Sequence, residues 1–204
     1  MSTILNSEKE NDYWSKRYEE AATGWDLGAP SKPLETYVNQ LTNKDLRILI
    51  PGAGNAYEAE FLWQQGFKNV VVLDISDIPL KNIKARMPDF PDAQLVRGNF
   101  FEHVGQYDLI LEQTFFCSFP PTKTHRELYA KTMSNLLITN GKLVGLWFDI
   151  PLIEGNMEKR PFGGSKSEYL GYLSPYFAVK IFETCHNSIK PRAGQELFGI
   201  FLKK

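Results

Sequence analysis

The 204-residue sequence predicts an α/β protein with a Rossmann-like fold: a seven-stranded, mostly parallel sheet with helices on both faces and a helical cap at the N-terminus. Three observations predict it. Strand-like apolar runs alternate with helical segments over residues 46–148, the pattern of a parallel sheet with right-handed crossovers. A glycine turn follows the first of these runs. The last two strand-like segments are joined only by residues 188–195, which predicts a terminal hairpin with one antiparallel strand.

The cap is expected over residues 1–44, ahead of a core over residues 45–204 in the same single domain. A helix over 11–22 brings Tyr13, Trp14 and Tyr18 close together on one side. Residues 23–28 include two glycines and break this helix into a loop that carries Trp25. A second helix is expected over 31–41. Pro33 lies in its first turn, a position that tolerates proline.

The stretch 47–74 contains the front half of a nucleotide-type cofactor site. Residues 48–50 form a buried-strand run that ends in the turn 51–54 (PGAG), where glycine lets the backbone turn tightly and lets a ligand approach closely. A helix over 57–65 and an apolar strand over 70–73 follow. Asp74 then lies about 20 residues after the turn, where a carboxylate can accept hydrogen bonds from both ribose hydroxyls of a bound adenosine.

The elements after Asp74 are predicted from periodicity and from turn residues. Helices are expected over residues 78–87, 123–137 and 167–173, the second of them strongly amphipathic and ended by Asn140-Gly141. Strands are expected over residues 94–97, 107–112, 142–148, 178–187 and 196–203. The polar segment 150–165 is expected to be a loop that acts as a lid.

Composition argues against several classes of protein. The net charge of −1 and the lack of a long basic run predict no nucleic-acid surface. No apolar run approaches membrane-spanning length, and the acidic first residues do not resemble a signal peptide. Two distant cysteines in apolar surroundings predict reduced thiols and a cytoplasmic location. No metal site is expected, because His103, His125 and His186 lack ligand spacing. We expect a monomer, since no surface stripe demands a partner.

A glycine turn and a distant acid are shared by sites for NAD, FAD and S-adenosylmethionine (SAM), and three details favour SAM. The pattern Gly52-x-Gly54-x-x-Tyr57 lacks the third glycine of the dinucleotide fingerprint. Asn99-Phe100 follows the third strand, where a short polar side chain can reach the adenine amino group and a ring can cover the base. Glu112-Gln113 ends the fourth strand and is placed to face the centre of the site. A NAD-type oxidoreductase is the alternative.

Seven motifs occur in order along the chain: Trp14-x-x-x-Tyr18, Trp25-Asp26-x-Gly28, Ile50-Pro51-Gly52-Ala53-Gly54, Leu73-Asp74-Ile75-Ser76, Asn99-Phe100-Phe101, Phe115-Phe116-Cys117 and Asn187-Ser188-Ile189-x-Pro191-Arg192-x-Gly194. Together they resemble the thiopurine S-methyltransferase family, and most of all its branch of methyl halide and thiol methyltransferases. The resemblance implies the class I methyltransferase fold and SAM as methyl donor, with S-adenosylhomocysteine (SAH) as product. It also implies a small-molecule acceptor with a soft nucleophile: a thiol or thiopurine, a halide, or a selenium or tellurium compound.

Carried over by position, the resemblance implies that three aromatic residues of the cap cover SAM, that Gly52 and Asp74 hold its methionine and ribose parts, and that Asn99-Phe100 lies beside adenine. The implied cofactor-binding residues are Trp14, Tyr18, Trp25, Gly52, Gly54, Asp74, Ile75, Asn99, Phe100, Glu112 and Gln113. Gln113 is also assigned to the substrate side, with Phe115 and Phe116. The family usually has Tyr or Arg at the position of Gln113, tryptophan at that of Tyr18 and aspartate at that of Asn99.

Methyl transfer from a sulfonium is an in-line displacement, which an enzyme promotes by aligning the reactants and excluding water. A thiolate or a halide needs no general base, so none is assigned. A mostly aromatic lining fits this chemistry, because rings attract a sulfonium by about 0.5–2 kcal/mol. A SAM-binding protein without catalysis is a further alternative, since Gln113 and residues 160–164 (RPFGG) differ from the family pattern.

The candidate residues also have purely structural interpretations. The three aromatic residues of the cap could fasten its helix to the core. Asp74 could be a helix N-cap. Glu112 could pair with Arg126 or Lys123, and Cys117 could be a buried, inert thiol.

Overall fold

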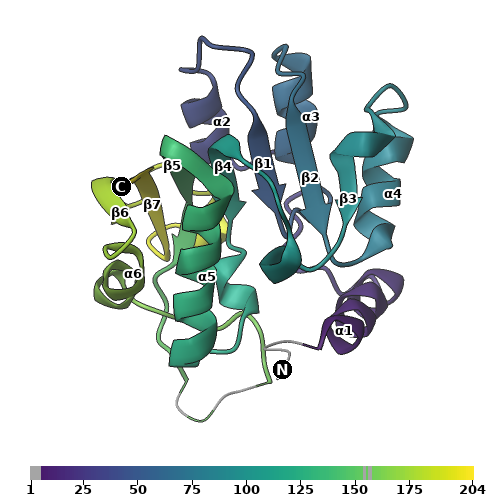
Figure 1. The fold of residues 1–204 in the computed structure, drawn as a ribbon. Coiled ribbons are helices and arrows are strands. Elements are labelled where there is room, and N and C mark those ends of the chain that lie inside the picture. The colour runs from purple at the N-terminus through teal and green to yellow at the C-terminus, as the bar shows by residue number, and fades with distance from the viewer. Residues whose placement is uncertain (1–5, 154, 156–157) are drawn as a thin grey trace.

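The computed structural model describes residues 6–153, 155 and 158–204, which form a seven-stranded sheet with helices on both faces (Figure 1). The strand order is β3-β2-β1-β4-β5-β7-β6. The strands are β1 (Ile48–Pro51), β2 (Val70–Asp74), β3 (Leu95–Arg97), β4 (Tyr107–Gln113), β5 (Leu137–Phe148), β6 (Phe177–Thr184) and β7 (Glu196–Lys203). The helices are α1 (Ser7–Glu19), α2 (Lys32–Val38), α3 (Tyr57–Gln64), α4 (Asp77–Arg86), α5 (Lys123–Leu136) and α6 (Lys166–Leu173).

The sheet has the predicted mixture of strand directions. Strands β1 to β5 pair in parallel, and β7 lies between β5 and β6, antiparallel to both. The prediction of a terminal hairpin is therefore confirmed. The chain runs from β1 outward to β3 and then returns to place β4 on the other side of β1. This reversal is a topological switch point, and ligands of such sheets bind outside the carboxyl ends of the strands there.

Two hydrophobic cores hold the helices to the sheet. Successive strand residues face opposite sides, so Ile48 and Ile50 belong to one core and Leu49 to the other. The first core contains buried residues of α2, α3 and α4, and the second contains those of α5 and α6. The sheet is thus covered on both faces, as expected for parallel strands such as β1 and β2, whose apolar runs are continuous.

Helix α1 lies at the carboxyl ends of the strands and contributes no fully buried residue (Figure 1). It begins at Ser7, four residues before the predicted start, because the side chain of Asn6 caps it by accepting a hydrogen bond from the Lys9 amide. Glu8 and Glu10 in the first turn also suit the positive end of the helix dipole. The helix ends at Glu19, before the predicted residue 22.

The boundary between α5 and β5 differs from the prediction. Leu137 is the first residue of β5 and pairs with Tyr107, and the helix stops at Leu136. Asn140 and Gly141 therefore lie inside β5 instead of ending the helix. The register shifts between Tyr107 and Leu109, and Asn140 adopts a φ of 63°, so these residues form an irregularity in the strand. A side chain at Gly141 would meet the Ile138 carbonyl, which explains the glycine.

Among the residues that the structure describes, no helix combines the length and the apolar character needed to cross a membrane.

Candidate functional site

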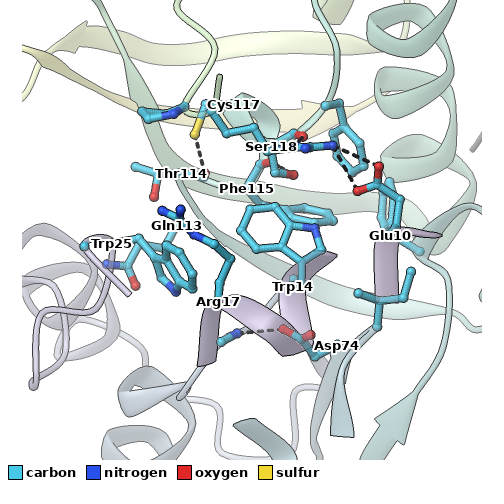
Figure 2. A pocket seen from close by; sticks show the side chains of 18 of the residues that line it. Glu10, Trp14, Arg17, Trp25, Asp74, Gln113, Thr114, Phe115, Cys117 and Ser118 are labelled. Carbon is cyan, nitrogen blue, oxygen red and sulfur yellow. Dashed lines mark hydrogen bonds and ion pairs between the residues drawn. The ribbon is translucent and has the colours of Figure 1, made fainter. Parts of the chain in front are cut away.

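A cavity of about 530 Å³ lies at the switch point, within the size range of small-molecule sites (Figure 2). Its walls come from α1 and the loop after it, and from the ends of β1, β2, β3 and β4 with the residues that follow them. The other lining residues are Phe148, Ile150, Arg160, Pro161, Pro191, Arg192 and Gln195. The structure brings eleven of the sequence-predicted residues to it: Trp14, Tyr18, Trp25, Gly52, Gly54, Asp74, Ile75, Asn99, Phe100, Gln113 and Phe115. The cavity therefore lies where the sequence places a cofactor.

The glycine turn after β1 has the backbone conformation that requires glycine. Gly52 and Gly54 have φ values of +55° and +56°, in the left-handed region. A β-carbon on Gly52 would overlap the ring of Phe115, at 2.0 Å, and one on Gly54 would lie 3.3 Å from the Tyr18 hydroxyl. The turn thus lets the loop after β4 and the helix α1 approach β1 closely, which gives the cavity its shape.

The carboxylate of Asp74 is buried beside this turn. One oxygen accepts a hydrogen bond from the Gly54 amide and the other accepts one from the Ser76 amide, each at 2.9 Å. Burial raises the pKa of Asp74 to about 6, although these amides oppose the shift. The N-cap of α4 is Ser76, which accepts from the Ile78 amide, so the interpretation of Asp74 as the cap is wrong. Its oxygens remain able to accept further hydrogen bonds from a ligand in the cavity.

Three aromatic residues of the N-terminal segment form one wall of the cavity. Trp25 meets Trp14 and Tyr18 edge to face, with ring centroids 5.3 and 5.6 Å apart. None of the three belongs to the two hydrophobic cores. All three line the cavity instead, which favours the site interpretation over simple attachment of the helix.

The aromatic segment after β4 divides between the cavity and the core. Phe115 and Phe119 line the cavity. Phe116 does not, which corrects its assignment to the substrate side: its ring is 2% exposed and packs edge to face on Tyr129 and Tyr169 in the second core. The short 3₁₀ helix Phe116–Ser118 turns successive side chains in different directions, so adjacent rings have different surroundings.

Glu112 is also placed differently from the prediction. Its side chain is fully buried and does not line the cavity. One carboxylate oxygen accepts hydrogen bonds from the amides of Phe115 and Phe116, at 2.5 and 2.7 Å. The proposed pairing with Arg126 is wrong as well, because Arg126 binds Glu168 and the Gly163 carbonyl. Glu112 therefore shapes the loop that carries Phe115, from beneath the cavity.

Arg160, from the predicted lid, reaches across to the cap. Its guanidinium donates to both carboxylate oxygens of Glu10, at 2.9 and 3.0 Å, and to the Ser118 carbonyl at 2.6 Å. It also lies over the ring of Tyr13, 4.5 Å from the centroid. Residues 154, 156 and 157 of the lid lie outside the described part of the chain. Sequence reasoning did not select Arg160 as a site residue, because its partner is 150 residues away.

Two further arginines line the cavity. Arg192 is paired with Glu196 at 3.2 Å and donates to the Trp25 carbonyl at 2.9 Å. Arg17 has no ion pair within the described residues, its Nε is buried without a hydrogen-bond partner there, and its guanidinium lies 5.9 Å from the Trp25 ring centroid. Arg17 therefore brings positive charge to the cavity that no described carboxylate neutralises. The sequence located Arg17 on the cap helix without assigning it a role.

The structure gives no sign of a nucleophilic thiol or of a metal site among the described residues. Cys117 lines the cavity, but its thiol donates to the Thr114 carbonyl at 2.8 Å and burial raises its pKa, so it stays protonated. Cys117 and Cys185 are both free and buried. Across the described ranges, no three His, Cys, Asp or Glu residues gather as metal ligands would.

Comparison with known proteins gives a match to one family over almost the whole chain. The family model of thiopurine S-methyltransferase (TPMT) matches residues 9–202. A protein named probable thiol methyltransferase 2, from Arabidopsis thaliana, is 32% identical over 206 aligned residues, which cover 98% of this chain and 88% of that protein. A thiopurine S-methyltransferase from Acinetobacter baylyi is 27% identical over 54% of this chain and 61% of its own length.

Solved structures share the fold at low sequence identity. The 1,6-didemethyltoxoflavin-N1-methyltransferase of Burkholderia thailandensis, crystallised with its substrate and SAH, has a TM-score of 0.75 and 14% identity over 100% of this chain and 93% of that chain. A TehB-like SAM-dependent methyltransferase from Corynebacterium glutamicum has a TM-score of 0.65 and 18% identity over 97% and 100%. Both are consistent with the predicted Rossmann-like architecture.

Proposed function

Because the chain belongs to the thiopurine S-methyltransferase family and is a SAM-dependent methyltransferase, we propose that it transfers the SAM methyl group to a small thiol or a related soft nucleophile. The family excludes the NAD-type alternative. The proposed acceptor class is supported by the lining of the cavity, in which aromatic side chains lie together with the guanidinium of Arg17. The thiol methyltransferase relative supports the same class.

The residues at the cavity fit SAM. The buried Asp74 carboxylate suits ribose hydroxyls, and the glycine turn leaves open backbone beside it. We assign the adenine end to Asn99 and Phe100, which line the cavity after β3, and the amino acid end to the region between Gly52 and Gln113. Trp14, Tyr18, Trp25, Gly54 and Ile75 complete the proposed cofactor site. When bound, SAM would supply a methyl group on a sulfonium, and the neutral thioether SAH would be the leaving group of the in-line displacement.

The protein's own contribution is alignment, exclusion of water and electrostatics. Aromatic side chains such as Trp14 and Phe115 exclude water from the reacting atoms. A guanidinium close to a thiol lowers the pKa of that thiol, because it stabilises the thiolate. Arg17 would therefore favour the thiolate, with the thiol proton released to water, so that no general base is needed.

The proposal is tested by offering the protein SAM with a panel of acceptors: aliphatic and aromatic thiols, a thiopurine, iodide, selenite and tellurite. Production of SAH is followed for each. We expect the highest kcat/KM for a thiol. Turnover with none of the thiols, while another member of the panel is methylated, would contradict the proposed acceptor class.

Replacing Arg17 by methionine removes the charge and keeps most of the side-chain length. We expect kcat/KM for thiols to fall by at least about tenfold, since a hydrogen bond to a charged group contributes about 1.5–3 kcal/mol. SAH affinity, measured by calorimetry, should stay within about threefold.

The matched control is Lys16→Met, which removes the neighbouring positive charge from the exposed side of α1, where Lys16 pairs with Glu20. It should leave both quantities unchanged. A loss of SAH affinity in Arg17→Met as large as the loss of kcat/KM would assign Arg17 to the cofactor instead of the acceptor.

A further inference from the structure

Glu58 is a buried acid whose role neither the sequence motifs nor the cavity lining explains. It is the second residue of α3, its exposure is 4%, and it does not line the cavity. One oxygen accepts a hydrogen bond from the Ser31 amide at 2.8 Å. No ion pair of Glu58 is found within the described residues. Burying an acid without an ion pair is costly, so its remaining hydrogen bonds indicate its role.

Gln113 supplies two further hydrogen bonds to this acid. With the amide nitrogen of Gln113 facing Glu58, it donates to the two carboxylate oxygens at 2.8 and 3.2 Å. The opposite orientation would place the amide oxygen against these oxygens, where an ionised carboxylate has no proton to donate. For the ionised acid, the hydrogen-bond network thus decides the amide orientation. It leaves the carbonyl oxygen of Gln113 as the end directed away from Glu58.

The position of Gln113 indicates which ligand group meets this oxygen. Gln113 ends β4 and lines the cavity, and β4 lies beside β1, where Leu49 pairs with Ile110. The same register carried forward brings Gln113 next to Gly52 and the glycine turn. The proposed function places the amino acid part of the cofactor there. Of its two charged groups, only the ammonium donates hydrogen bonds, whereas the carboxylate would be repelled by a carbonyl oxygen.

We propose that Glu58 is a positioning residue that holds the Gln113 amide with its oxygen toward the cavity, where that oxygen accepts a hydrogen bond from the ammonium of the SAM amino acid part. This inference rests on the proposed placement of the cofactor. Gln113 departs from the family pattern, which usually has Tyr or Arg at this position. It then takes part in cofactor binding in an orientation that Glu58, on α3, fixes. Specificity for the amino group of the cofactor follows from the hydrogen bond between two side chains on different elements, α3 and β4.

The test compares two ligands by calorimetry: SAH, and an SAH analogue in which hydrogen replaces the α-amino group. In Glu58→Gln, residue 58 can donate as well as accept, so the Gln113 amide is free to turn. We expect SAH affinity to fall by about fivefold or more, and affinity for the deaminated analogue to stay within about twofold. Glu60→Gln is the matched control, because Glu60 lies on the same helix and pairs with Arg86 at the surface; both affinities should be unchanged.

A double variant, Glu58→Gln with Gln113→Glu, exchanges the two side chains. The amide at 58 can then donate to the carboxylate at 113, whose second oxygen still faces the cavity. We expect this exchange to restore SAH affinity to within about threefold of the unsubstituted protein. Equal losses for the two ligands in Glu58→Gln, or no loss for either, would overturn the inference. Because the readout is binding without an acceptor, a failure of the thiol proposal in the turnover panel leaves this test intact.

Discussion

Replacing Asp74 by alanine is expected to weaken SAH binding by more than about tenfold. The variant removes the buried carboxylate proposed to accept hydrogen bonds from the ribose, and such charge-assisted bonds contribute about 1.5–3 kcal/mol. It also leaves the amides of Gly54 and Ser76 without their acceptor, which loosens the glycine turn. Calorimetric titration with SAH measures the effect directly.

The matched control is Asp77→Ala. Asp77 begins α4 only three residues further on, but its side chain is exposed and pairs with Lys81. SAH affinity should change by less than about twofold, because an exposed ion pair contributes little. Unchanged SAH affinity in Asp74→Ala itself would mean that Asp74 only accepts hydrogen bonds from the amides of Gly54 and Ser76 and does not bind the ligand.

The pH dependence of binding provides an independent check. Burial raises the pKa of Asp74 to about 6, so the carboxylate is mostly protonated below that pH and accepts hydrogen bonds poorly. SAH affinity should therefore fall as the pH is lowered from about 7 to about 5, and Asp74→Asn should remove this dependence. The same shift lowers the free energy of unfolding as the pH rises from about 4 to about 6, because the folded state binds the proton more tightly than the unfolded chain.

Replacing Glu112 by alanine is expected to lower the free energy of unfolding by about 2–5 kcal/mol. The substitution leaves the amides of Phe115 and Phe116 buried without an acceptor, and each unsatisfied buried group costs about 1–3 kcal/mol. It also leaves an empty space where Gly145 approaches the Glu112 side chain. Urea denaturation followed by fluorescence measures the loss.

Two variants separate this effect from a general loss of acidic charge. Glu112→Gln keeps an oxygen that can accept from both amides, so its loss should be below about 1 kcal/mol. Glu127→Ala removes an exposed partner of Lys123 and should change stability by less than about 0.5 kcal/mol. If Glu112→Ala kept full stability but lost SAH binding, Glu112 would be a ligand contact, as the sequence pattern suggested. Because burial raises the pKa of Glu112 to about 8, its contribution to stability decreases as the pH rises from about 4.5 to about 8.

The glycine turn and Asp74 could be located from the sequence because their signals are local. The turn needs glycine for its positive φ values, and the acid must end the next strand, so spacing alone places both at one edge of a parallel sheet. Phe115 and Phe116 show where local signals stop. They are adjacent and chemically identical, and only the 3₁₀ turn and the position of Tyr129 decide which ring enters the core.

By itself the sequence determined the succession of strands and helices, the terminal hairpin and the edge of the sheet at which the cavity lies, because apolar periodicity and turn residues act over a few positions. Only the tertiary structure decided the partners of the charged and amide groups: Arg160 with Glu10, Glu58 with Gln113, and Glu112 with the amides beneath Phe115. Such hydrogen bonds depend on atoms brought within about 3 Å by packing. No spacing along the chain encodes that proximity when the partners come from different elements.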